Sequence, residues 1–113
     1  MAKFMVLYSS EQKASEVMAN ATPEQMKAGM DTWIRWRGEA EKKLKVDFGM
    51  PLEAVGAITS NGPAESTSRV SGYSIIEGDK DAVMDILKTH PHLQQPGNSI
   101  DVLEMLPMPG LDV

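Results

Sequence analysis

The chain has only two histidines, His90 and His92, which lie on either side of Pro91. Histidine is the side chain whose ordinary pKa lies closest to neutral pH, so it is the first candidate for moving protons. Asp47 and Asp101 are carboxylates that could orient the imidazole of His90. We therefore take His90, Asp47 and Asp101 as the candidate catalytic residues. The alternative is that His90 ends the buried side of a helix and only packs against the core.

A metal site is a second possibility for the segment His90-Pro91-His92. Two imidazoles this close can ligate zinc or copper, but a third protein ligand is expected, and the chain has no further histidine and no cysteine. The sequence also lacks the glycine-rich loops that bind nucleotides and the Gly-x-Ser-x-Gly turn of serine hydrolases. We therefore predict no metal and no cofactor.

A helix expected over residues 23–45 could form one wall of a ligand pocket. Its apolar side carries Trp33, and Arg37 projects from the middle of that side. Either the stem of Arg37 packs while its guanidinium reaches a carboxylate, or its charge faces a cavity that holds an anion. Together with Tyr73 and His92, these are the candidate ligand-binding residues for a small organic anion, in a pocket between helix and sheet.

The expected elements follow the order strand, helix, strand, strand, helix, strand. Thr22, Pro23 and Gln25 form the cap and capping-box pattern of a helix start, and Asp79 is suited to cap a second helix. Strands are expected over residues 3–8, 54–60, 70–77 and 99–106, and helices over 23–45 and 80–89, with a short helix possible at 11–18. The strands 54–60 and 70–77 should pair antiparallel. With right-handed crossovers, this order predicts one α+β domain over residues 1–113. Its fold would be ferredoxin-like, with a four-stranded antiparallel sheet and two helices on one face.

Such a sheet has a second face that the two helices cannot cover. The first expected strand is apolar on both sides, with Met5 and Leu7 on one and Phe4 and Val6 on the other. A second copy of the sheet would cover the remaining apolar side over an interface of about 1,600 Å². We therefore predict a homodimer with the two sheets facing each other.

Composition narrows the remaining function classes. Eleven basic and sixteen acidic residues give a net charge of -5, without the basic stripe that nucleic-acid binding requires, so no nucleic-acid partner is expected. No apolar run reaches the roughly 20 residues needed to cross a bilayer, so no membrane partner is expected either. The lack of cysteine fits a reducing compartment, and we predict a cytoplasmic protein.

Several segments together resemble a known family. They are the strand 3–8, the turn Asn61-Gly62-Pro63-Ala64-Glu65, the strand 72–77, and His90-Pro91-His92-Leu93 followed by the strand 100–104. In this order and spacing the chain resembles the YCII-related proteins, close to their DGPF branch. The resemblance covers nearly the whole chain and implies a dimeric α+β barrel.

The chain also departs from the family pattern. Asn61 and Ala64 replace the acidic residue and the phenylalanine of the DGPF turn. In some members a histidine and an aspartate before a proline are a proposed acid–base pair, and here Gln25 and His90 occupy those positions. Because glutamine cannot exchange a proton, the pair is not carried over intact.

Two functions follow from these expectations. The first is a non-catalytic protein that binds a small molecule or another protein, with a pocket between helix and sheet. The alternative is an isomerase, hydrolase or decarboxylase acting on a small organic acid, with His90 as the acid or base, Asp47 or Asp101 orienting it, and Arg37 holding the substrate carboxylate.

Overall fold

A computed structural model describes residues 2–110 of the chain. Its main feature is a four-stranded antiparallel sheet with the strand order β2-β5-β1-β6. In chain order, the elements are β1 (Ala2–Ser9), α1 (Ala14–Asn20), α2 (Pro23–Ala40), β2 (Lys45–Asp47), β3 (Ala57–Thr59), β4 (Gly62–Ala64), β5 (Val70–Gly78), α3 (Lys80–Leu87), the 3-10 helix η1 (Pro91–Gln94) and β6 (Ser99–Glu104). The expected α+β class and the four-stranded antiparallel sheet are confirmed.

Both expected helix starts are present. The Thr22 side chain accepts a hydrogen bond from the Gln25 backbone N–H, and the Gln25 side chain accepts one from the Thr22 N–H. Asp79 caps α3 by accepting from the backbone N–H of Ala82. These bonds satisfy N–H groups that the first turn of a helix otherwise leaves without partners. The local sequence is therefore sufficient to start both helices.

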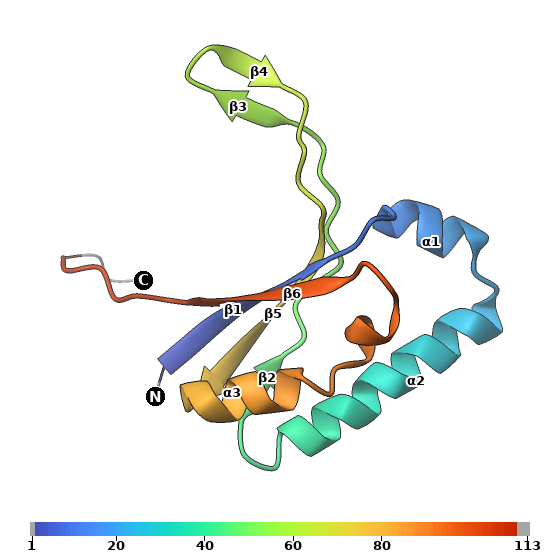
Figure 1. Cartoon of the computed structure of the whole chain (residues 1–113), viewed down its shortest axis with the longest axis vertical. Helices are drawn as coiled ribbons and strands as arrows, with labels where there is room; N and C mark the ends of the chain where they lie inside the picture. Colours follow the sequence, from blue (N-terminus) through green and yellow to red (C-terminus); the bar gives the residue numbers. More distant parts are fainter. Residues whose placement is uncertain (1, 111–113) are drawn as a thin grey trace.

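The core lies between one face of the sheet and the helices α2 and α3, which pack on the same side of it (Figure 1). Alternate residues of β1 and β5 point into this layer, because successive side chains of a strand face opposite ways. The buried apolar residues are Phe4, Val6, Tyr8, Trp36, Ala40, Leu44, Val46, Ile76, Val83 and Leu87.

The expected second strand is wrong. The strand that pairs with β5 is β2, where Val46 lies opposite Ile76, and residues 57–64 instead form the separate hairpin β3–β4. Val46 explains the difference, because it is buried opposite Ile76, whereas Val55 and Ile58 of the expected strand are 99% and 87% exposed. The helix α2 accordingly ends at Ala40, earlier than the expected residue 45, so that the chain can enter β2.

The outer face of the sheet is the one opposite α2 and α3. Met5, Leu7, Tyr73 and Ile75 of β1 and β5 are half-buried there, and Leu103 of β6 is 51% exposed. The hairpin β3–β4 rises from the body on this same side (Figure 1). The two-sided apolar character expected of the strands is therefore present.

The first half of α2 extends past the core. Trp36 and Ala40 are buried, whereas Met26, Met30 and Ile34 are each about half exposed, so only part of the expected apolar side of this helix packs. Among the described residues, no helix combines the length and the apolar character that crossing a bilayer requires.

Candidate functional site

His90 lies at the centre of a cluster of rings formed by Tyr8, Trp33, Trp36, Phe48, His90 and His92, which we call the aromatic cluster. The His90 side chain is 1% exposed. Its ring centroid lies 4.3 Å from that of Trp36, 4.4 Å from that of Trp33 and 4.9 Å from that of Tyr8. The Trp33 ring stands perpendicular to the imidazole, in the edge-to-face arrangement that aromatic pairs favour.

Local chain geometry places His90 in this position. The helix α3 ends at Leu87, and Pro91 begins η1, so His90 becomes the residue that caps η1. Its Nδ1 accepts a hydrogen bond of 3.0 Å from the backbone N–H of His92. This bond requires Nδ1 to be unprotonated, so the neutral ring carries its proton on Nε2.

The Nε2 atom of His90 is buried, and no hydrogen-bond partner for it lies among the described residues. A buried N–H without a partner costs about 1–3 kcal/mol. The Trp33, Trp36 and Tyr8 rings around it can offer only the weaker attraction of an aromatic face. The aromatic cluster therefore contains a buried donor without a partner, His90 Nε2.

Burial and, to a smaller extent, the neighbouring charge of His92 together lower the pKa of His90 from its ordinary value of 6.5 to about 4. Desolvation has this effect because the charged imidazolium loses more hydration than the neutral ring. At neutral pH the ring is therefore uncharged and its one lone pair is engaged by the His92 N–H. Such an imidazole can donate a hydrogen bond but has no proton to release at that pH.

Tyr8 and Ser74 connect the aromatic cluster to the sheet. The Tyr8 hydroxyl donates to Ser74 Oγ over 2.9 Å, and Ser74 Oγ donates to the carbonyl oxygen of Phe48 over 3.0 Å. Burial raises the pKa of the Tyr8 phenol, while its bond to Ser74 lowers it less. Tyr8 therefore remains neutral and holds a fixed orientation beside His90.

His92 links the end of β1 to the segment before β6. Its Nε2 lies 2.8 Å from the carbonyl oxygen of Ser9, and since a carbonyl only accepts, this nitrogen carries the proton. The side chain of Asn98 donates to the His92 carbonyl oxygen over 3.1 Å. Within residues 2–110, no group of three or more acidic or histidine side chains is arranged to hold a metal ion.

The structure does not bring the candidate carboxylates to His90. Asp47 pairs with Ile75 and Asp101 with Leu7, which places both on the outer face of the sheet, whereas His90 lies against Tyr8 on the inner face. The carboxylate of Asp47 accepts from the backbone N–H of Gly49 over 3.1 Å. The group that orients His90 is the backbone N–H of His92 and not an aspartate.

The four candidate ligand-binding residues separate into two groups. Trp33 and His92 belong to the aromatic cluster, with ring centroids 6.4 Å apart. Tyr73 lies on the outer face, where it packs over Gly49, whose φ is +67°. Arg37 forms an ion pair of 2.9 Å with Glu41, and its guanidinium lies 4.8 Å from the ring centroid of Phe48. Of the two possibilities for Arg37, this arrangement corresponds to the packed stem with a carboxylate partner.

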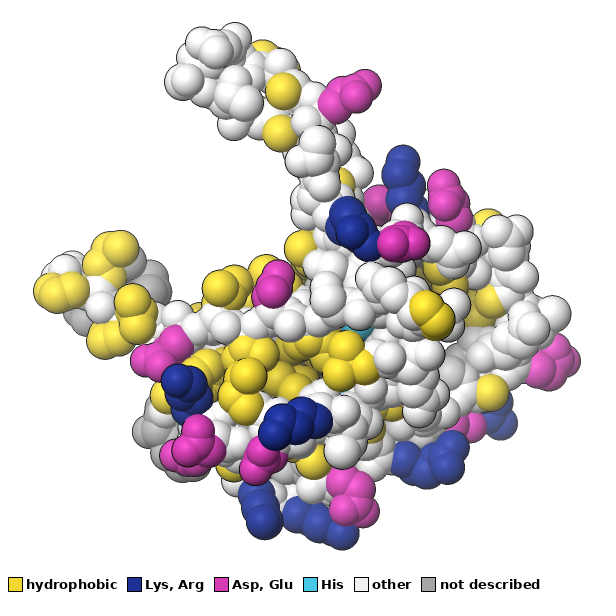
Figure 2. Space-filling view, viewed as in Figure 1, with side chains coloured by type: hydrophobic (Ala, Val, Ile, Leu, Met, Phe, Trp, Pro, Cys, Tyr) yellow, Lys and Arg dark blue, Asp and Glu magenta, His cyan; other side chains and the backbone are white. Residues whose placement is uncertain are grey.

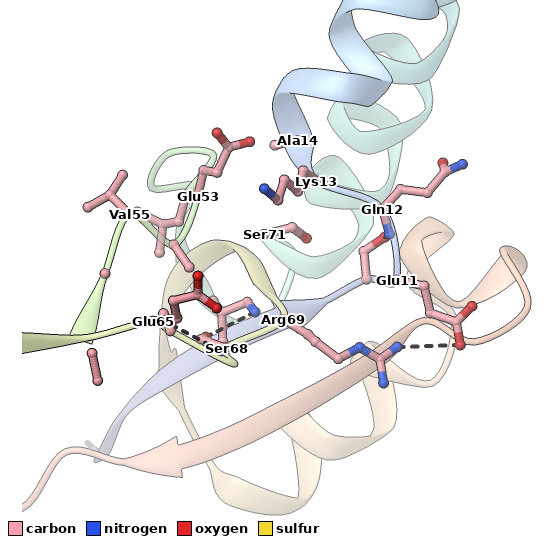
Figure 3. Close-up of a pocket in the computed structure, with 17 residues that line it drawn as sticks. Glu11, Gln12, Lys13, Ala14, Glu53, Val55, Glu65, Ser68, Arg69 and Ser71 are labelled. Carbon is pink, nitrogen blue, oxygen red and sulfur yellow. Dashed lines mark hydrogen bonds and ion pairs between the residues drawn. The ribbon is translucent and has the colours of Figure 1, made fainter.

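Two hollows lie outside the aromatic cluster. The larger, of about 480 Å³, lies between the segment before α1 and the base of the β3–β4 hairpin (Figure 3). Its lining carries charges of both signs, including Lys13, Glu65 and the 3.6 Å pair of Arg69 with Glu11. Glu53 also lines it and accepts from the Ser15 hydroxyl and N–H, which lower its carboxyl pKa. The second hollow, of about 460 Å³, lies beside α1.

Sequence reasoning missed part of the aromatic cluster. Trp36 was expected beside Trp33 on the apolar side of the helix, where both would form a wall of the pocket, whereas Tyr8, Phe48 and Ser74 were not expected near His90 at all. One available signal was helical spacing, since Trp33 and Trp36 are three residues apart and so lie on one side of a helix. A second signal was the position of Tyr8 near the end of a strand that is apolar on both sides, because such a strand is expected to be buried.

Comparison of the chain with protein-family models, with curated proteins and with solved structures gave no match.

Proposed function

We propose that this protein binds a small, partly apolar organic acid without catalysing its conversion, and that the ligand accepts a hydrogen bond from His90 Nε2. The observation that carries the proposal is the buried donor without a partner at the centre of three aromatic rings. Ligand sites are typically apolar and aromatic, with a few polar groups that orient the ligand. A carboxylate or carbonyl oxygen placed at Nε2 would satisfy the free donor.

Trp33 is the residue we expect to move when the ligand enters. Its side chain is only half-buried, and its neighbours along α2, Met30 and Ile34, are about half exposed. A rotation of this ring away from His90 would open a path to Nε2 without disturbing Trp36, whose indole N–H donates to the carbonyl oxygen of Ile86 over 3.1 Å. The ligand would then stack where the Trp33 ring now lies.

The geometry favours binding over the enzymatic alternative. A general acid or base near neutral pH needs a pKa close to that pH, and the pKa of His90 is about 4. The carboxylates that would assist proton transfer, Asp47 and Asp101, lie on the other face of the sheet. Arg37, which would hold the substrate, is paired with Glu41.

We further propose that the fold is the ferredoxin-like one of the YCII-related proteins and that the protein is a homodimer. The strand order β2-β5-β1-β6 supports this fold. A ferredoxin-like sheet, with the element order βαββαβ, has its first and third strands at the centre and its second and fourth at the edges, and here these are β1 and β5 at the centre and β2 and β6 at the edges. The half-buried Met5, Leu7, Tyr73 and Ile75 of the outer face support a second sheet packed against them. Sedimentation showing only monomer at micromolar concentration would contradict the homodimer.

Intrinsic fluorescence offers a direct test of ligand binding, because both tryptophans of the chain pack against His90. We expect benzoate to change the emission and to raise the melting temperature increasingly with its concentration. Acetate should do so much less because it lacks the ring. His90→Phe should lose the benzoate response because it removes the donor. Asp101→Asn, a change on the outer face, should keep it.

The proposal fails if benzoate and related aromatic acids change neither signal at millimolar concentration. It also fails if His90→Phe responds as strongly as the unaltered chain. Enzymatic function would instead be supported by turnover of such an acid that His90→Phe abolishes and Asp101→Asn leaves intact.

A further inference from the structure

The segment of residues 51–69, which we call the arm, extends away from the body of the molecule and carries β3 and β4 near its end (Figure 1). Its base is tied to the sheet. The Leu52 N–H donates to the Ser71 carbonyl oxygen over 2.9 Å, and the Ser10 N–H donates to that of Arg69 over 2.9 Å. The direction of the arm is therefore set by the strand β5 that it joins.

The arm carries two large aliphatic side chains that face solvent. Val55 is 99% exposed and Ile58 is 87% exposed. Figure 2 shows separate apolar side chains, in yellow, along the otherwise mostly white arm. The two strands of the hairpin have three residues each, and a two-stranded hairpin on its own is marginally stable in water. Such a hairpin needs a further surface to pack against, and its exposed side chains are of the type that would bury there.

The chain as a whole exposes more surface than a compact monomer does. The solvent-accessible surface is 8365 Å², which exceeds the roughly 6,100 Å² expected of a folded monomer of this mass by about 2,200 Å². The radius of gyration, 15.8 Å, likewise exceeds the roughly 13 Å of a compact chain of this length. Stable interfaces bury about 800 Å² or more on each partner, so the excess is sufficient for an extensive one.

We propose that the arm packs against a second copy of this chain, so that two arms clasp the homodimer from either side. This inference rests on the homodimer proposed above. The arm rises on the same side of the sheet as the outer face, so a second sheet packed on that face would lie beside it (Figure 1). The contact made by the arm is then continuous with the contact made by the sheet.

The length of the arm agrees with this arrangement. About eight extended residues separate its base from its turn, which corresponds to a reach of roughly 26 Å. Two sheets that pack face to face are about 10 Å apart. The end of the arm therefore passes beyond the plane of the partner's sheet, and Val55 and Ile58 come alongside the second copy.

Photo-crosslinking can test the contact, with Ile58 replaced by p-benzoylphenylalanine in an otherwise full-length chain. Equal amounts of 14N- and 15N-labelled chains are mixed and allowed to exchange subunits. The sample is then irradiated and digested, and the masses of the linked peptides are measured by mass spectrometry. We expect covalent dimers in which the two linked peptides carry different nitrogen isotopes. The matched control places the same residue at Lys88, which caps the C-terminal end of α3 and whose side chain is 75% exposed, and should give no covalent dimer.

Dissociation of the dimer provides a second measurement. Ile58→Asp places a charge in the proposed contact, and because a symmetric dimer contains the residue twice, we expect the dissociation constant to rise at least about tenfold. Thr67→Asp adds the same charge at another exposed position of the arm and should change it little.

The outcomes separate the two proposals. Mixed-isotope links from position 58, together with a weakened Ile58→Asp dimer, support the arm contact. A stable dimer without links between chains from position 58, or with no effect of Ile58→Asp, overturns the arm contact and leaves the homodimer standing. A chain that sediments as a monomer overturns both.

Discussion

Lowering the pH should destabilise this protein to a large extent through His90. In the unfolded chain this imidazole takes up a proton near its ordinary pKa of 6.5, whereas in the folded protein burial delays protonation to about pH 4. Between these values the unfolded state binds more protons than the folded state, so the free energy of unfolding falls with falling pH. The stabilising contribution is complete above pH 6.5 and is lost as the pH falls through the pKa of the folded state.

The size of the effect follows from the difference between the two pKa values. Each pH unit of difference corresponds to about 1.4 kcal/mol, so the full loss below pH 4 is about 3 kcal/mol. At pH 5 the free energy of unfolding has already fallen by roughly 2 kcal/mol through His90. Against a typical total of about 5–15 kcal/mol for a folded domain, this is a substantial fraction.

The assay is urea unfolding at several pH values between 7.5 and 4.5, followed by far-UV circular dichroism. The comparison is with His90→Phe, which fills a similar space, does not titrate and has no donor to satisfy. Carboxylates contribute equally to the pH dependence of both chains, so the difference between the two curves isolates His90. His92→Phe keeps His90 and should retain most of the acid-induced loss.

The reasoning is refuted if the free energies of unfolding of the unaltered chain and His90→Phe stay parallel over this pH range. Parallel curves would mean that His90 titrates at an ordinary pKa when folded, so that its burial among Tyr8, Trp33 and Trp36 does not persist in solution.

Two further changes test the outer face. Gly49→Ala should lower the free energy of unfolding by at least about 2 kcal/mol in urea unfolding, because φ at Gly49 is +67° and a Cβ there would lie 2.3 Å from the Tyr73 carbonyl oxygen. An unchanged stability would show that this turn is not held against Tyr73. Leu103→Lys should abolish self-association in sedimentation while leaving the circular dichroism spectrum unaltered, because Leu103 is half exposed within one subunit. A dimer that survives this change would contradict the facing sheets.

Local sequence determined the starts of the main elements. The Thr22 and Asp79 caps use bonds within three residues of each other along the chain, so the residue types alone were sufficient to predict them. The continuous apolar run of β1 and the strong strand formers of β5 likewise predicted these two strands. These features depend on neighbours in sequence and not on the rest of the fold.

Strand pairing decided what local sequence could not. Residues 45–47 became the second strand because Val46 can bury opposite Ile76, a contact between segments thirty residues apart. Register also placed Asp47 and Asp101 on the outer face, since a shift of one residue along a strand moves a side chain to the opposite side. Spacing in sequence carries no information on that choice.

The environment of His90 is likewise a tertiary property. The helical spacing of α3 predicted that His90 would be buried, and it is. The rings that surround it come from β1 and α2, and its partner is a backbone N–H that η1 presents. Burial follows from a pattern within one helix, whereas a lowered pKa and an unsatisfied donor depend on which distant groups close around the ring.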